Sequence, residues 1–329
     1  MRVLIIGRTE ILYDTILLLA GQFTICGIIT SVASPEYSKK EEDFELLAKE
    51  TGCPFMVSNS INAQTQQFIQ QCKPDIGVSI NWVSVINKDT IDLFKEGILN
   101  AHPGDLPGYR GNAIFNWAII KHAPEAVLCI HKMEAGELDS GNILLKRRMP
   151  LQNTTTVKNL VEFWQKETPG MFLEVLNGIV SGTLKEQPQH LIDGEPFRCY
   201  PRLPVDSKIN WDLHAIDIDA LIRASTKPYS GAYCFVKLNA GIKKLYIWES
   251  RIVKEKTTDI GSPGHVLFND KETGESHILT GEGIVAINHV QYEGEEIFSP
   301  GKKWKSIRMR LSIDIESELI NLYKLLGKQ

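Results

Sequence analysis

Three polar residues that could together move a proton and stabilise an oxyanion stand at positions 100, 102 and 139. Asn100 and His102 end a short apolar run, and Asp139 follows a second apolar run at 126–131. An imidazole accepts a proton near neutral pH, and a carboxylate can orient it. A fixed amide can donate a hydrogen bond to developing negative charge. These side chains could therefore manage one proton and one oxyanion.

The two apolar runs predict buried strands of an α/β sheet. Residues two apart on an extended chain point to the same side, so Asn100 and His102 are expected to face one way. The prolines and glycines at 103–108 predict an irregular loop after His102. The run at 126–131 is expected to be a second parallel strand, followed by a glycine-containing loop that presents Asp139. Open α/β folds bind ligands at such strand ends.

Each of the three residues also has an ordinary structural interpretation. His102 is one of eight histidines, and a single histidine is more often structural than catalytic. Asn100 could bond its own backbone at a strand end, and Asp139, which precedes Ser140-Gly141, could cap a turn. The joint pattern, rather than any single residue, favours chemistry.

The wider motif resembles the signature of the folate-dependent formyltransferases. It consists of Asn-Ala-His at 100–102, Leu-Pro-Gly-Tyr-Arg-Gly at 106–111 and Leu-Asp-Ser-Gly at 138–141. The three pieces occur in the order and with the approximate spacing of that family. The family includes enzymes that act on methionyl-tRNA, on glycinamide ribonucleotide and on nucleotide-linked amino sugars.

The resemblance implies transfer of a formyl group from 10-formyltetrahydrofolate to a primary amine through a tetrahedral intermediate. His102 is then expected to be the general base, and Asn100 to stabilise the oxyanion. Asp139 is expected to orient His102 and to help a proton reach the departing folate nitrogen.

The resemblance also implies where the folate binds. The folate is expected against a strand end and the loop before Asp139, at Ile80, Asn81, Trp82, Met133, Glu134 and Leu138. Core packing is an equally good interpretation of Trp82. The acceptor pocket is expected to involve Tyr109, Arg110 and Asn112. Arg110, interpreted as lying at a helix start, should pair with a substrate phosphate or carboxylate, or with an internal acid such as Asp105.

Length and pattern predict two domains. A chain of 329 residues with 43% hydrophobic residues can bury two cores. We expect an α/β, Rossmann-like formyltransferase domain with a mostly parallel sheet at 1–186 and a proline-rich linker at 187–204. The resemblance and five short strands predict a small open β-barrel of the OB type at 205–329. Only one glycine, Gly7, follows the first strand, which argues against a nicotinamide dinucleotide.

The net charge and the cysteine pattern restrict the binding partners and the cellular compartment that we expect. The net charge of −4 provides no electrostatic footprint for a polyanion. The six cysteines show no CxxC pair and no metal-like spacing, so no metal site is expected and the thiols fit a reducing compartment. There is no signal-peptide pattern and no apolar run of 18 residues, so a cytoplasmic protein without a membrane partner is expected.

The motif leaves the acceptor open. Methionyl-tRNA and purine enzymes typically have His-x-Ser-Leu-Leu-Pro, whereas Pro103-Gly104-Asp105 follows His102 here. This change in the motif and the absence of a net positive charge both favour a nucleotide-linked amino sugar as the substrate. No nucleic-acid partner is therefore expected. The alternatives are a methionyl-tRNA formyltransferase and a non-catalytic binder that keeps the fold. A homodimer is expected for a sugar-acting member.

Overall fold

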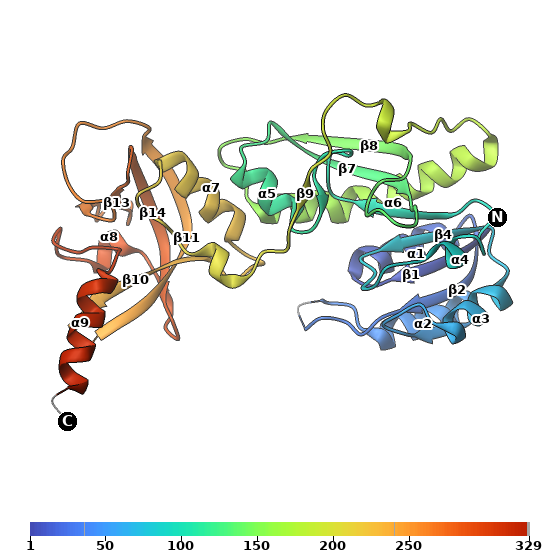
Figure 1. The fold of residues 1–329 in the computed structure, drawn as a ribbon, viewed down its shortest axis with the longest axis horizontal. Helices are drawn as coiled ribbons and strands as arrows, with labels where there is room; N and C mark the ends of the chain where they lie inside the picture. Colours follow the sequence, from blue (N-terminus) through green and yellow to red (C-terminus); the bar gives the residue numbers. More distant parts are fainter. Residues whose placement is uncertain (36, 240, 328–329) are drawn as a thin grey trace. The chain divides into compact units, whose positions relative to one another are not determined.

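The computed structural model describes residues 1–35, 37–239 and 241–327 and divides into two compact units (Figure 1). Residues 240, 328 and 329 of the expected 205–329 domain lie outside the described residues. Unit 1 comprises residues 1–115, 125–150 and 160–201, and unit 2 comprises the remaining segments, which are 116–124, 151–159 and the chain from 202 onward.

Seven strands form the main sheet of unit 1. They are β1 Arg2–Gly7, β2 Thr24–Thr30, β3 Phe55–Val57, β4 Ile76–Ile80, β5 Ile98–His102, β7 Glu125–Lys132 and β8 Ile143–Pro150. The sheet order is β3-β2-β1-β4-β5-β7-β8. The pairings from β3 to β5 are parallel, while β7 and β8 pair antiparallel. The predicted mostly parallel α/β fold is confirmed.

Strand β7 runs antiparallel to β5, so the prediction of a parallel strand at 126–131 is wrong. The apolar run indicates burial on both faces, which does not fix strand direction. Asn100 lies directly opposite His131, and His102 opposite Cys129. The chain therefore leaves β7 beside the start of β5, where the Met133 amide donates to the Ile98 carbonyl at 2.7 Å. The loop at 133–142 then leads into β8.

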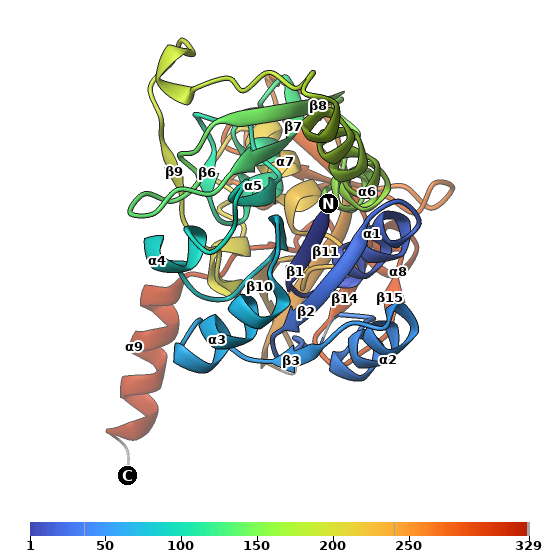
Figure 2. The ribbon, with the colours of Figure 1, turned by 90° about the vertical axis from the view of Figure 1, so that its right-hand side faces the viewer.

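Helices cover both faces of this sheet (Figure 2). They are α1 Glu10–Ala20, α2 Glu41–Thr51, α3 Ala63–Cys72, α4 Lys88–Ile91 and α6 Val157–Ser181, most of which lies in unit 1. Helix α5, Ile114–Ile120, begins in unit 1 and lies mostly in unit 2. On one face, Ile69 and Cys72 of α3 share a hydrophobic cluster with Leu4 and Ile6 of β1. The Asn62 side chain begins α3 by accepting the Thr65 amide at 3.1 Å.

The single glycine after β1 serves close backbone approach. Gly7 has a φ of 141°, and a Cβ placed there would lie 2.0 Å from the Ile80 carbonyl oxygen. That oxygen accepts the Arg8 amide at 3.2 Å. Gly7 thus allows the chain that follows β1 to pass close to the backbone at the end of β4.

The proline-rich segment after α6 packs back on unit 1 as far as residue 201. It contains the 3₁₀ turn η1 Gln189–Leu191 and the short strand β9 Arg198–Cys199, and the 3₁₀ turn η2 Pro204–Ser207 follows in unit 2. β9 pairs in parallel with β6, Arg110–Gly111. The interpretation of Arg110 as a helix-start residue is wrong, since it lies in β6 and α5 begins at Ile114. The helix dipole argument for Arg110 therefore no longer applies.

Unit 2 is an open antiparallel β domain. Its strands are β10 Ala232–Leu238, β11 Gly241–Lys254, β12 Val266–Asn269, β13 Ser276–Leu279, β14 Ile284–Tyr292 and β15 Ile297–Phe298. They form a six-stranded sheet in the order β10-β11-β14-β13-β12, with β15 on β14. The five predicted strands correspond to β10 through β14, while the prediction missed the two-residue β15 and the full 14-residue length of β11.

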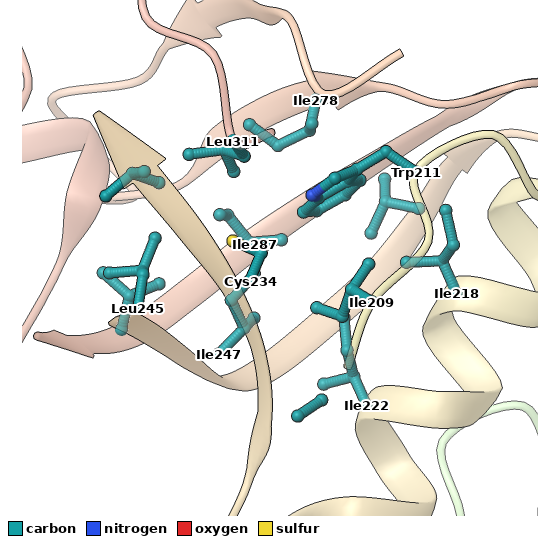
Figure 3. Packing of buried hydrophobic residues seen from close by; sticks show 14 of the residues in the cluster. Ile209, Trp211, Ile218, Ile222, Cys234, Leu245, Ile247, Ile278, Ile287 and Leu311 are labelled. Carbon is teal, nitrogen blue, oxygen red and sulfur yellow. The ribbon is translucent and has the colours of Figure 1, made fainter. Parts of the chain in front are cut away.

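The core of unit 2 lies between this sheet and helix α7, Ala215–Ser225 (Figure 3). Trp211, Cys234 and Ile287 belong to one buried cluster with Ile218 and Ile222 of α7. Two further helices follow the sheet, α8 Pro300–Lys303 and α9 Ile315–Leu326. None of the helices in the described part of the chain has the length and apolarity needed to span a membrane.

Candidate active site

Strand β5 and the loop between β7 and β8 bring together the three residues selected from the sequence. His102 Nδ1 lies 3.6 Å from Asp139 Oδ2, and both side chains are less than a tenth exposed. Asn100 lies on the same strand two residues before His102. The loop folds back from its exit beside Ile98 to place Asp139 against His102.

The hydrogen bond of His102 identifies its basic nitrogen. Nε2 lies 2.7 Å from the Tyr109 carbonyl oxygen, which can only accept. Nε2 therefore carries a proton, and in the neutral ring the lone pair is on Nδ1, which faces Asp139. Gly104 permits this arrangement, because a Cβ there would lie 2.5 Å from the Tyr109 oxygen and 2.6 Å from His102 Nε2.

Asp139 is held by backbone groups and by a residue that sequence reasoning missed. Its Oδ2 accepts the Gly111 amide at 3.0 Å. The buried Gln189 side chain donates to the carbonyl oxygens of Asp139 and Gly141 at 2.7 and 2.8 Å. Gln189 comes from η1, within the segment expected to be a linker, and no local motif marks it. It fixes the loop whose φ at Asp139 is 55°.

His131 is a second residue of the candidate site that sequence reasoning missed. Its Nδ1 donates to the Lys132 carbonyl at 2.8 Å, so Nε2 is free to accept the Asn100 Nδ2–H at 3.1 Å. Nε2 also lies 3.6 Å from Asp139 Oδ1. Burial, and then the neighbouring His102, lower the pKa of His131 to about 4. The one available signal was a histidine at the end of an apolar run.

The residues expected to bind folate occupy different environments. The Ile80 side chain is fully buried, so only its backbone could meet a ligand. Asn81 is exposed and donates to the Tyr37 hydroxyl at 2.7 Å. Trp82 and Met133 both pack against the hydrophobic cluster on the α3 face of the sheet, in line with the packing interpretation of Trp82. Glu134 and Leu138 are exposed on the loop.

A polar cleft of about 460 Å³ lies beside the loop that carries Asp139. Of the three residues expected in the acceptor pocket, only Arg110 lines it. The Tyr109 ring instead packs edge-on against Phe197 at 4.7 Å. Asn112 is exposed, and its backbone amide donates a hydrogen bond to the Cys199 carbonyl at 3.0 Å.

Arg110 has an internal acidic partner, but it is Glu137. The second Arg110 amino group donates to Gln189 Oε1 at 2.8 Å. The suggested partner, Asp105, instead lies 2.5 Å from Lys146 Nζ on β8, so that interpretation is wrong. The acid at position 105, which enters this motif beside the glycine at the usual serine position, is thus paired with a lysine. Lys146 also donates to the Leu106 carbonyl at 2.7 Å. Asp105 therefore anchors the loop after His102.

Two family models match the chain over both units. The formyl transferase model matches residues 9–176, and the model of the formyl transferase C-terminal domain matches residues 204–308. The chain belongs to the formyl transferase family. A methionyl-tRNA formyltransferase from Clostridium tetani is 28% identical to this formyl transferase over 233 residues, which is 70% of each chain.

Solved structures share the fold of this formyl transferase. A sugar 3N-formyl transferase, WlaRD, studied in the presence of dTDP and 5-N-formyl-THF, matches with a TM-score of 0.62 and 17% identity, over 90% of this chain and 98% of its own. An N-formyltransferase from Helicobacter canadensis, in complex with folinic acid and dTDP-3-aminofucose, matches with a TM-score of 0.62 and 18% identity, over 90% and 99%.

The geometry fits the needs of a formyl transferase. Attack of an amine on a formyl carbon releases one proton and places negative charge on one oxygen. His102 Nδ1 offers a lone pair beside a carboxylate, which would stabilise the imidazolium. Asn100 has an amide nitrogen with two hydrogens, and His131 uses one of them. A donor to an oxyanion needs such a second hydrogen.

The depressed pKa of His131 makes the stability of this formyl transferase depend on pH. The pKa of a histidine is about 6.5 in an unfolded chain, against about 4 for His131 in the fold. Between these values the unfolded chain binds a proton that the folded chain does not. The stability linked to the neutral His131 ring is therefore fully present above pH 6.5. As the pH decreases to 4, the free energy of unfolding falls by roughly 3 kcal/mol.

His131→Gln should remove the part of the pH dependence of stability that His131 causes. Urea unfolding at pH 7 and pH 4.5 measures the free energy of unfolding of both proteins. Other groups also titrate in this range, so the informative quantity is the difference between the wild type and the variant at each pH. We expect any advantage of the wild type at pH 7 to decrease at pH 4.5. Parallel stability curves for the two proteins would show that His131 titrates normally.

Proposed function

We propose that this formyl transferase moves the formyl group of 10-formyltetrahydrofolate to the primary amine of a nucleotide-linked amino sugar. The observation that carries the reaction type is the buried pair formed by His102 Nδ1 and Asp139, with the Asn100 amide on the same strand. The proposed folate contacts are the backbone at 80–82 and the loop residues Met133, Glu134 and Leu138.

The proposed reaction proceeds in two steps. The amine attacks the formyl carbon while His102 Nδ1 accepts its proton, and the Asn100 N–H donates to the resulting oxyanion. Asp139 stabilises the imidazolium. The tetrahedral intermediate then collapses, the bond from carbon to the folate nitrogen breaks, and the proton held by His102 passes to that nitrogen. The products are the formamide and tetrahydrofolate.

The charge of the carboxy-terminal part of the chain supports a small acceptor over tRNA. From residue 202 onward the chain has 18 Lys and Arg against 17 Asp and Glu. Several of these cations are paired, including Lys243 with Glu295 and Arg251 with Glu275. In the basic segment 302–310, Lys303 lies over the Phe298 ring at 4.0 Å. A tRNA would favour a larger excess of free cations.

The two structural neighbours add support, because one was solved in the presence of dTDP and the other in complex with dTDP-3-aminofucose. The alternative acceptor is methionyl-tRNA, which is favoured by the curated relative from Clostridium tetani. It predicts tight binding of methionyl-tRNA that weakens steeply with added salt. The absence of such binding at low salt would exclude this alternative.

A melting-temperature screen tests the proposed ligands before any assay of turnover. A ligand that binds only the folded state raises its apparent stability. We expect stabilisation by 5-formyltetrahydrofolate and, independently, by one of dTDP, UDP or GDP. Stabilisation by the folate alone would favour tRNA or a free amine. No effect of any folate would contradict the proposed donor and leave the non-catalytic binder as the better account.

We also propose that the protein is a homodimer and that α9 takes part in the contact. Helix α9 has no buried residue among those described, and its large apolar side chains are all about half exposed or more. They are Ile315, Leu319, Ile320, Leu322, Tyr323, Leu325 and Leu326. Exposed apolar faces of this kind are typical of protein interfaces.

A further inference from the structure

His131 and Asn100 face each other across the β5–β7 ladder and share a hydrogen bond. They are directly paired in register, and the Asn100 Nδ2 to His131 Nε2 distance is 3.1 Å. The His131 side chain is 2% exposed. This contact connects the predicted oxyanion donor to a residue with no role so far in the proposed reaction.

The tautomer of His131 dictates the orientation of the Asn100 amide. His131 Nδ1 must carry the ring proton, because its partner at 2.8 Å is the Lys132 carbonyl. Nε2 then has only a lone pair to offer. Asn100 must therefore turn its nitrogen, and not its oxygen, toward His131. The second hydrogen on the same nitrogen is left for a ligand.

We propose that His131 is a positioning residue that locks the Asn100 amide with its nitrogen presented to the formyl oxygen. The inference rests on the proposed function, in which Asn100 stabilises the oxyanion. Without this acceptor, the amide could rotate by half a turn and place its own oxygen near the developing negative charge. Such an orientation would oppose the reaction that the observed one assists.

The surroundings of His131 keep it in the neutral form that this role requires. Burial and the adjacent His102 disfavour a charged ring, while Asp139 favours it. A protonated Nε2 would donate toward Asp139 Oδ1, now 3.6 Å away, and could no longer accept from Asn100. The two states of the ring thus correspond to two different arrangements of the site.

Replacement of His131 should lower kcat through Asn100 alone. His131→Leu removes the acceptor, and we expect kcat to fall roughly tenfold, the kinetic equivalent of one hydrogen bond, with KM for the folate nearly unchanged. His131→Gln, which can still accept, should recover most of the loss. In an Asn100→Ala background, His131→Leu should have almost no further effect. Equal losses in both His131 variants, or losses that add to that of Asn100→Ala, would overturn the proposal.

A measurement without turnover separates this inference from the proposed function. Nitrogen-15 NMR of the histidine rings in the wild-type protein at pH 7 should show a neutral His131 with the proton on Nδ1, and its Nε2 signal should shift in Asn100→Ala. A ring protonated on Nε2 would refute the positioning role even in an active enzyme. The expected tautomer in a protein that formylates no amine would leave the hydrogen bond intact and refute the proposed function.

Discussion

His102→Gln is expected to lower kcat by roughly 10²- to 10⁴-fold, the contribution typical of a general base. Glutamine can place an amide nitrogen near the position of Nε2 and so keep the donation to the Tyr109 carbonyl, now 2.7 Å long. It cannot replace the lone pair of Nδ1 that faces Asp139. The expected defect is therefore chemical, and steady-state formylation kinetics would measure it.

A matched variant and two independent readouts make this prediction specific. His289→Gln changes an exposed histidine of unit 2 that pairs with Glu249 at 2.6 Å, and it should retain wild-type kcat. The melting temperature and folate affinity of His102→Gln should stay close to those of the wild type. A His102→Gln enzyme with a kcat within threefold of the wild type would contradict the assignment of the base.

Asn100→Ala is expected to lower kcat by roughly 10²- to 10³-fold, as removal of an oxyanion donor does in other acyl transfers. KM for the formyl donor should change little, because the hydrogen bond strengthens only as charge develops on the oxygen. The variant also leaves His131 without its donor at 3.1 Å. Presteady-state formylation with saturating donor isolates the chemical step.

The control for Asn100→Ala is the variant Asn177→Ala on helix α6. Asn177 is an exposed amide that donates to Gln22 at 3.3 Å, so its removal should affect neither kcat nor KM. An Asn100→Ala enzyme that loses donor affinity in proportion to its rate would indicate a ground-state contact. That outcome would assign Asn100 to folate binding and leave the oxyanion without a side-chain donor.

The sequence carried enough information to predict that Asn100 and His102 share one strand beside a buried sheet edge. Residues two apart on a strand face the same side, and Asn100 and His102 both lie on β5 as expected. Apolar runs and their punctuation likewise predicted the α/β sheet of unit 1. These features are local, because a few neighbouring residues determine both burial and turn formation.

Features that depend on long-range pairing could not be predicted in this way. The direction of β7 places His131 opposite Asn100, but an apolar run looks the same in either direction. Gln189 reaches Asp139 from 50 residues away in a segment with no regular pattern. The true partner of Arg110, Glu137, was one of several nearby acids, and only the folded chain distinguishes it from Asp105.

The measurement that most directly tests the central claim is a formylation assay with 10-formyltetrahydrofolate and a panel of acceptors, analysed by mass spectrometry of the products. The panel contains dTDP-, UDP- and GDP-linked amino sugars and methionyl-tRNA, and His102→Gln serves as the inactive control. We expect one amino-sugar nucleotide to be converted to its N-formyl derivative by the wild type, with methionyl-tRNA unchanged. Formylation of methionyl-tRNA alone, or of no acceptor, would contradict the account.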